Sequence, residues 1–281
     1  MQPASAIDIP VSFGMERSYE VGMRQIIAIT NEKGGVAKTT TTLSLGGALV
    51  EAGKEVLLID LDAQANLTLG LGVSPAKTHR SVADALLNSA SLLSISRETA
   101  IPGLDLVPSN PDMLLSERFL TIRQDYEKIL SGSLSTLTTY DYVLLDCPPS
   151  LGAVSLNAMT AAHMIIIPTQ PEYFSVHGLR GVLASIRKVR SQNNPGLYYK
   201  VLITMLDRRN RIHNTLSNQI RTTFGEGVFE TCIETDTKLR ESTVVGLPIT
   251  HYYPRCRSAN QYRALAQELI EHATSKAAQP A

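Results

Sequence analysis

The chain has 281 residues, 43% of them hydrophobic, which is enough to bury a substantial core in one large α/β domain or in two small ones. Its formal net charge is zero, which gives no overall sign of a polyanionic partner, but residues 180–263 hold 14 Lys or Arg against 6 Asp or Glu. Three cysteines without a C-x-x-C pair exclude a disulfide framework, and no apolar run is long enough for a signal peptide or a membrane span, so a cytoplasmic protein is expected.

Short β-rich runs alternate with helical stretches along the chain. The expected strands are 25–30, 56–60, 104–108, 142–146, 164–168, 200–205 and 228–233. The expected helices are 39–52, 112–130, 152–162, 176–191, 212–224 and 258–272. Most of the strands are continuously apolar, which is typical of strands covered on both faces. The pattern predicts a doubly wound, mainly parallel α/β sheet in a single domain, 24–273, between an N-terminal tail, 1–23, and a C-terminal tail, 274–281.

The first strand leads into a glycine-rich loop, N-E-K-G-G-V-A-K-T-T, and a helix follows. Gly34 and Gly35 allow backbone N–H groups to curl around an anion, and the helix N-terminus adds partial positive charge. Lys38 can reach terminal phosphates as a point charge, and the Thr39 hydroxyl can bind Mg²⁺. The predicted nucleotide-binding residues of this loop are Lys33, Gly34, Gly35, Val36, Ala37, Lys38, Thr39 and Thr40.

Carboxylates stand at the ends of two other strands. Asp60 and Asp62 follow the second strand and point to the same side of an extended chain, and the fourth strand ends at Asp146 before a Pro-Pro turn. Ligands of an open parallel sheet bind beyond the carboxyl ends of its strands, so the loop and these acids are expected to meet. One carboxylate of the first pair can order a metal-bound water and the other can orient the attacking water, while Asp146 would lie behind Mg²⁺.

Three segments resemble the deviant Walker ATPases, and their order is similar to that of the ParA/Soj partition proteins. Residues 33–39 resemble the family's K-G-G-x-G-K-T loop, residues 60–66 its D-L-D-P-Q-G-N segment, and residues 146–150 its D-x-P-P-S segment. The likeness extends over about residues 24–272. It is closest to the short form of these proteins, because residues 1–23 are too few for the helix-turn-helix domain of the longer form.

The resemblance implies a slow ATPase that binds ATP with Mg²⁺ and forms a homodimer around it. In this family the first lysine of the loop, here Lys33, reaches across the dimer interface to the partner's nucleotide, where it would act as an arginine finger does. By the same match, Lys38 contacts the terminal phosphates, Asp62 positions the lytic water, and Asp60 supports the metal shell. Ala37 replaces the family's usual glycine, and one methyl group near the phosphates is expected to affect turnover more than binding.

A ParB-like activator and a DNA track are also implied by the resemblance. The cargo would be a chromosome, a plasmid or a protein assembly, and the ATP-bound form would be nucleoid-associated. Residues 1–179 hold 11 Lys or Arg against 18 Asp or Glu, so the basic C-terminal third stands apart and favours phosphate contacts with duplex DNA without sequence reading. The alternative is an ordinary solvated surface. The candidate DNA-binding residues are Lys238, Arg240, Arg255 and Arg257, of which Lys238 aligns with a basic position implicated in DNA contact.

The family's adenine-binding segment, I-P-R-N-V-R-L, aligns with residues 233–239. By this match Glu234 would contribute backbone contacts and Asp236 would face the base. The segment departs from the family at the Pro and Asn positions, and the alternative is a polar surface loop.

Three other functions share the loop or its chemistry. A MinD-like, membrane-associated ATPase ends in a basic amphipathic helix, but residues 268–281 hold one Lys and little apolar face. A nitrogenase-type iron–sulfur reductase holds a cluster with paired cysteines, whereas Cys147 adjoins Asp146 and the other cysteines are distant in sequence. A nucleotide-controlled binding module would bind ATP tightly without stimulated phosphate release.

Overall fold

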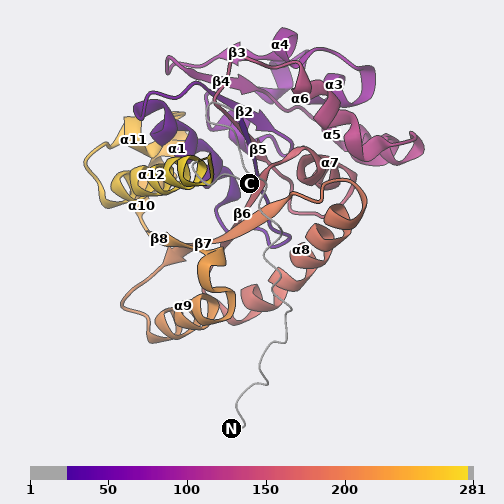
Figure 1. Cartoon of the computed structure of the whole chain (residues 1–281). Coiled ribbons are helices and arrows are strands. Elements are labelled where there is room, and N and C mark those ends of the chain that lie inside the picture. Colours follow the sequence, from indigo (N-terminus) through magenta and orange to yellow (C-terminus); the bar gives the residue numbers. More distant parts are fainter. Residues whose placement is uncertain (1–23, 278–281) are drawn as a thin grey trace.

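The structure is a computed structural model that describes residues 24–277, so the predicted N-terminal tail, 1–23, lies outside the described residues. An eight-stranded sheet with the order β3-β4-β2-β5-β1-β6-β7-β8 crosses the molecule (Figure 1). Neighbouring strands are parallel except β3 and β4. The strands are β1 (Gln25–Ile29), β2 (Val56–Asp60), β3 (Arg97–Glu98), β4 (Leu104–Val107), β5 (Tyr142–Asp146), β6 (Met164–Thr169), β7 (Tyr198–Leu206) and β8 (Val228–Glu234). The predicted doubly wound, mainly parallel sheet is confirmed.

Helices cover both faces of the sheet, and each face has its own hydrophobic core. One core is formed with α1, α2, α10, α11 and α12, and the other with α3 to α9 (Figure 1). The helices are α1 (Lys38–Glu51), α2 (Asn66–Leu69), α3 (Val82–Asn88), α4 (Leu92–Ile95), α5 (Met113–Phe119), α6 (Ile129–Ser135), α7 (Ala153–Ala161), α8 (Tyr173–Gln192), α9 (Arg211–Phe224), α10 (Thr237–Val245), α11 (Ile249–Tyr252) and α12 (Arg257–Ala277).

Strand β1 shows why the strands are continuously apolar. Ile26 and Ala28 belong to one core, whereas Ile27 and Ile29 belong to the other, because successive side chains of a strand point to opposite faces. All four are at most 5% exposed. A strand covered on both faces therefore needs an unbroken apolar run.

The helices between β4 and β5 differ from the sequence prediction. The predicted helix 112–130 is divided into α5 and α6 by two 3₁₀ turns. Asp125 lies at the start of the second turn with a φ of 52°, in the left-handed region, which interrupts a right-handed helix. Two further helices, α3 and α10, are not predicted from the sequence and begin at the polar N-caps Ser81 and Asp236.

The last helix is longer than predicted. It continues to Ala277 instead of ending at residue 272, so residues 274–277 of the predicted C-terminal tail are helical, and 278–281 lie outside the described residues. Across the range from 24 to 277, no helix combines the length and the apolar character that crossing a membrane requires.

Candidate functional site

The glycine-rich loop connects β1 to α1 at the carboxyl edge of the sheet, and neighbouring strands hold it. The buried Asn31 side chain donates from Nδ2 to the carbonyl oxygen of Pro168 in β6 (2.8 Å), and its Oδ1 accepts from the backbone N–H of Lys33 (3.0 Å). The Thr204 hydroxyl of β7 donates to the carbonyl oxygen of Val36 (3.1 Å). The path of the loop is therefore fixed by β6 and β7.

Two loop residues adopt the left-handed conformation. Gly35 has a φ of 74° and Ala37 has a φ of 68°. Glycine adopts this conformation without strain, whereas it costs an alanine about 1–2 kcal/mol. Ala37 occupies the position that is glycine in the standard phosphate-loop pattern, so the backbone gives a physical reason for that glycine. Ala37 is also the N-cap of α1, and its carbonyl oxygen accepts from the backbone N–H of Thr41 (2.9 Å).

Lys38 begins α1 and is 9% exposed. Its Nζ donates to the carbonyl oxygen of Lys33 (3.3 Å), so the ammonium group lies across the loop. Burial lowers the pKa of Lys38 below its usual value, and the nearby Asp146 carboxylate opposes this change. A buried cation inside a loop of backbone groups is suited to a polyanionic ligand.

Two buried carboxylates lie side by side beneath the loop. Asp60 of β2 and Asp146 of β5 are partners in the parallel register, and both are at most 1% exposed. The Thr39 hydroxyl donates to Asp146 Oδ2 (2.7 Å), and the Thr42 hydroxyl donates to Asp146 Oδ1 (3.2 Å). Asp60 accepts from the backbone N–H and the hydroxyl of Thr68 (2.8 and 2.7 Å). The prediction that the loop meets these strand ends is confirmed.

Burial raises the pKa of both of these carboxyl groups. It raises the pKa of Asp60 to about 6, although the hydrogen bonds from Thr68 work in the opposite direction. It also raises the pKa of Asp146, and the charge of the neighbouring Asp60 raises it further. Two negative charges without a cation between them are unfavourable here, so the pair is suited to the neighbourhood of a metal ion.

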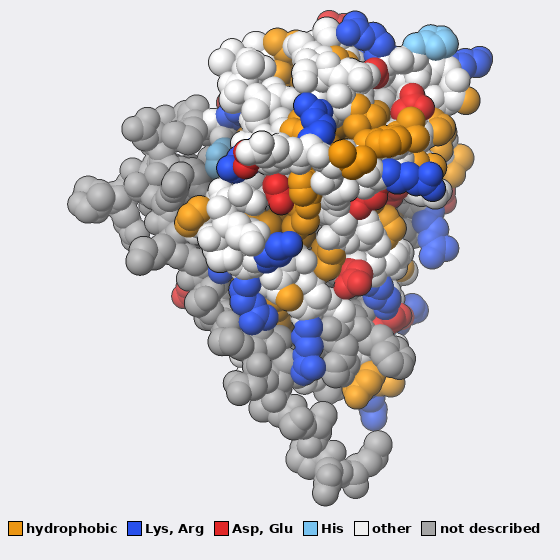
Figure 2. Space-filling model, turned by 90° about the vertical axis from the view of Figure 1, so that its right-hand side faces the viewer, with side chains coloured by type: hydrophobic (Ala, Val, Ile, Leu, Met, Phe, Trp, Pro, Cys, Tyr) orange, Lys and Arg blue, Asp and Glu red, His pale blue; other side chains and the backbone are white. Residues whose placement is uncertain are grey.

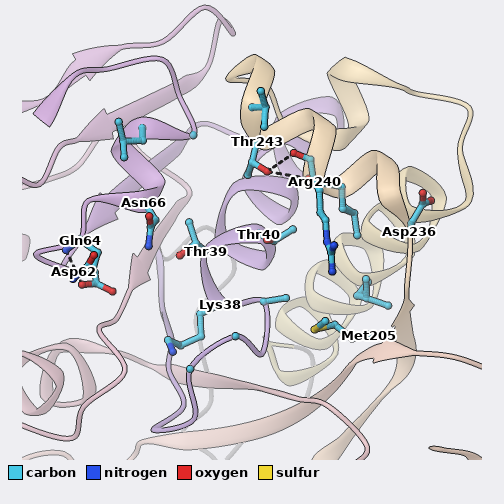
Figure 3. Close-up of a pocket in the computed structure, with 18 of the residues that line it drawn as sticks. Lys38, Thr39, Thr40, Asp62, Gln64, Asn66, Met205, Asp236, Arg240 and Thr243 are labelled. Carbon is cyan, nitrogen blue, oxygen red and sulfur yellow. Dashed lines mark hydrogen bonds between the residues drawn. The ribbon is translucent and has the colours of Figure 1, made fainter.

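A cavity of about 790 Å³ opens beside the loop. Asp62 and Gln64 lie on the side opposite Arg240 (Figure 3). The Asp62 carboxylate accepts from the Gln64 backbone N–H at Oδ1 (2.9 Å), and its carbonyl oxygen accepts from the Ser109 hydroxyl (2.7 Å). The predicted residues that line the cavity are Gly34, Gly35, Ala37, Lys38, Thr39, Thr40, Asp62, Glu234 and Asp236.

Several lining residues are absent from the sequence prediction. They are Gln64, Asn66, Leu69, Gly70, Pro149, Met205, Ile233, Thr235, Leu239, Thr243 and Val244. Gln64 and Asn66 belong to a motif already recognised after β2, whereas Met205, Thr243 and Val244 come from β7 and α10 and carry no local signal. Arg240, which is a candidate DNA-binding residue by sequence, also lines the cavity.

Lys33 is not among the residues that line this cavity. Its Nζ forms an ion pair with Glu172 Oε2 (2.6 Å), the N-cap residue of α8, and the two side chains are 31% and 45% exposed. Its ammonium group therefore does not occupy the same position as that of Lys38.

The segment predicted to hold adenine is built around ion pairs. The Glu234 carboxylate is paired with Arg208 (2.7 Å) and Arg257 (2.9 Å). Asp236 Oδ1 accepts from the Lys238 backbone N–H, and its Oδ2 accepts from the Ser258 hydroxyl (2.8 Å). Both carboxylates thus already have partners, and Asp236 serves as the N-cap of α10.

The four predicted DNA-binding residues differ in their surroundings. Lys238 is paired with Glu241 (2.6 Å), Arg257 is paired with Glu234, and Arg240 lines the cavity. Arg255 is exposed. The face that carries α5 and α8 shows Lys and Arg side chains scattered among acidic, neutral and hydrophobic ones (Figure 2).

Comparisons with known proteins agree with this geometry. Residues 24–199 match the model of a family described as "AAA domain". The chain is 39% identical to the sporulation initiation inhibitor protein Soj of Bacillus subtilis, over 88% of this chain and 98% of that protein. It is 36% identical to the chromosome partitioning protein ParA of Caulobacter vibrioides, over 92% and 98% of the two chains.

A solved structure gives the same result for the fold. Cobyrinic acid a,c-diamide synthase from Mycobacterium smegmatis, with a bound ATP analogue and magnesium, superimposes with a TM-score of 0.81 at 34% identity, over 90% of this chain and 96% of that one. The similarity to these Soj and ParA proteins covers 98% of the length of each of them. The chain therefore belongs to the Soj/ParA family of P-loop partitioning ATPases.

Proposed function

We propose that the chain is an Mg²⁺-dependent ATPase that forms a homodimer on ATP, binds duplex DNA without sequence preference and hydrolyses ATP slowly until a ParB-like partner stimulates it. The observation that carries the proposal is the convergence of Lys38, Thr39 and Asp62 at one end of a cavity, with Asp146 bonded to Thr39 behind them. Such a protein would act in the cytoplasm, on the nucleoid, to segregate or position DNA or another large cargo.

The residues of the site fit Mg·ATP. The cavity has a volume typical of a nucleotide pocket, and the 14-residue helix α1 directs its N-terminus toward the loop. Within residues 24–277, no group of three or more His, Cys, Asp or Glu side chains could hold a metal ion. Mg²⁺ commonly keeps several waters and shares its ligands with phosphates, so one hydroxyl backed by two carboxylates is sufficient.

Each residue near the loop has a role that its contacts support. The bound nucleotide would supply the γ-phosphorus that water attacks, and Mg²⁺ would neutralise charge on the phosphate oxygens. Lys38 and the loop N–H groups would bind the phosphates. The Thr39 hydroxyl can ligate Mg²⁺ through its oxygen while it donates its proton in a hydrogen bond to Asp146 Oδ2 (2.7 Å). Asp60 and Asp146 would accept hydrogen bonds from waters of the metal shell.

Asp62 is the proposed positioning group for the attacking water. Its Oδ1 accepts from Gln64, which fixes the carboxylate, and its Oδ2 has no hydrogen bond to any other described residue. The residue is half-buried and lines the cavity, so a water can reach it. A carboxylate held in this way can orient a nucleophile without becoming a metal ligand.

Lys33 is proposed to act on the nucleotide of the partner protomer. Its ion pair with Glu172 is partly exposed, and such pairs contribute about 0–1 kcal/mol to stability. The partner's phosphates carry several negative charges and can therefore compete with one carboxylate for this ammonium group. The DNA-binding part of the proposal is supported by the family and by the basic balance of residues 180–263.

The proposal is tested by replacing the water-positioning group. Asp62→Ala is expected to keep Mg·ATP binding and to accumulate the ATP-bound dimer, because only the orientation of the water is lost. Phosphate release and sedimentation with ATP measure the two effects. A variant that hydrolyses ATP at the wild-type rate, or that stays monomeric with ATP at high protein concentration, would contradict the proposal.

A mixing experiment tests the role of Lys33 in trans. Lys33→Gln and Asp62→Ala are each expected to be inactive alone. In their mixed dimer one site combines the intact Asp62 of one protomer with the intact Lys33 of the other, so an equal mixture should recover about a quarter of the wild-type rate. A mixture that stays as inactive as its components refutes the exchange of Lys33 between protomers.

A further inference from the structure

Helix α10 forms one rim of the cavity. Arg240, Thr243 and Val244 line it from positions one turn apart, which places them on one face of the helix. The Arg240 side chain extends from this helix into the pocket toward Met205 of β7, on the far side from Asp62 (Figure 3).

Arg240 differs from the basic residues around it. Lys238 is paired with Glu241, and both Arg208 and Arg257 are paired with Glu234. The guanidinium of Arg240, in contrast, has no hydrogen bond or ion pair to any residue of the described range. It is a charged planar group that ends in the cavity and is available to a ligand.

The surroundings of this guanidinium indicate which part of a ligand it would meet. Lys38 and the loop stand at the phosphate end, whereas Met205, Ile233 and Leu239 supply apolar surface at the end near Arg240. An apolar wall with a planar cation suits an aromatic base, because a guanidinium packs well on the face of a ring. The carboxylates of Glu234 and Asp236, which also line this end, already have partners.

We propose that Arg240 is a nucleotide-binding residue that packs its guanidinium against the base, and not a DNA-contacting residue. This inference rests on the proposed function, because it takes the ligand of the cavity to be Mg·ATP. Arg240 then secures the base end of the nucleotide while Lys38 secures the phosphate end. The position is on an exposed helix, where alanine is well tolerated, so variants are expected to fold.

The test compares two ligands that differ in the base. Binding of Mg·AMPPNP and of Mg·tripolyphosphate is measured by calorimetry for wild type, Arg240→Ala and Arg240→Lys. Arg255→Ala is the matched control, because Arg255 is exposed and is not among the lining residues. Arg240→Ala is expected to bind the nucleotide about 3- to 30-fold more weakly and tripolyphosphate as wild type does, and Arg240→Lys should recover at most part of the loss.

The other possible results of this experiment would overturn the proposal, each for a different reason. Equal losses for both ligands would show a long-range charge effect and overturn the base contact. Unchanged nucleotide affinity in Arg240→Ala, with weaker duplex DNA binding, would overturn the proposal and return Arg240 to the DNA surface. If wild type binds neither ligand, the proposed ATPase function fails first, and the role of Arg240 fails with it.

Discussion

Replacing Asp146 by Asn is expected to stabilise the nucleotide-free protein at alkaline pH, although it impairs the Mg²⁺ site. Asp146 and Asp60 are paired on neighbouring strands and at most 1% exposed. Burial raises the pKa of both carboxyl groups, and the charge of Asp60 adds to the effect on Asp146. Without a metal ion, ionising this pair therefore opposes folding.

The magnitude follows from the pKa of Asp146. Burial, with a further contribution from the charge of Asp60, raises it from 3.8 to about 8, so the folded state retains a proton that the unfolded chain loses, and stability falls as pH rises through this interval. The two pH units from pH 6 to pH 8 lie inside this interval and correspond to about 3 kcal/mol for one retained proton. Removing one of the two charges should recover stability on the order of 2–3 kcal/mol at pH 8 and less at pH 6. The hydroxyls of Thr39 and Thr42 can donate or accept, so an Asn side chain can keep its partners.

Urea unfolding at pH 6 and pH 8, without Mg²⁺ or nucleotide, measures this effect. Asp125→Asn is the matched control, because Asp125 is exposed and Asn tolerates its positive φ. Asp146→Asn should gain stability over wild type from pH 6 to pH 8, whereas the control should not. An equal loss of stability at both pH values would refute the reasoning, because the hydrogen bonds of Asp146 would then outweigh its charge.

Two further predictions concern the core and the DNA surface. In Gly47→Ala the added Cβ would lie 2.5 Å from Pro248 Cβ, so a loss of about 1–3 kcal/mol is expected in urea unfolding, whereas Gly132→Ala, with no atom within 4 Å, should not lose stability. Equal stabilities of the two variants would contradict this packing. Arg255→Glu in the ATP-trapped dimer should lower duplex affinity equally for all sequences and flatten the salt dependence by about one contact. A sequence-dependent change would show that this residue reads bases.

The sheet and the phosphate end of the site could be predicted because each rests on a strong local signal. Continuous apolar runs predict the seven longer strands. Because ligands bind at the carboxyl ends of parallel strands, the sequence also predicts that Asp60 and Asp146 lie near Lys38. The two-residue strand β3 was missed, since a segment of that length carries no periodic pattern.

The base end of the cavity could not be predicted in the same way. Helix α10 has nine residues, and its Val244 and Val245 are 88% and 54% exposed, so hydrophobic periodicity does not mark it. The role of Arg240 depends on which of the nearby basic side chains are already in ion pairs, and those pairs join residues far apart in the sequence, such as Arg208 with Glu234. The charge balance of residues 180–263 counts all of these basic residues alike and does not show which of them are paired.

The most direct test of the central claim is a calorimetric titration of wild type and Lys38→Ala with ATP and Mg²⁺. Lys38 is 9% exposed and lies across the phosphate loop, so its removal takes away a charge-assisted contact worth about 1.5–3 kcal/mol, or roughly 10- to 150-fold in affinity. Wild type should bind and the variant should bind more weakly by that factor, with the fold retained by circular dichroism. Equal affinities, or no binding by wild type, would contradict the assignment of this cavity to Mg·ATP.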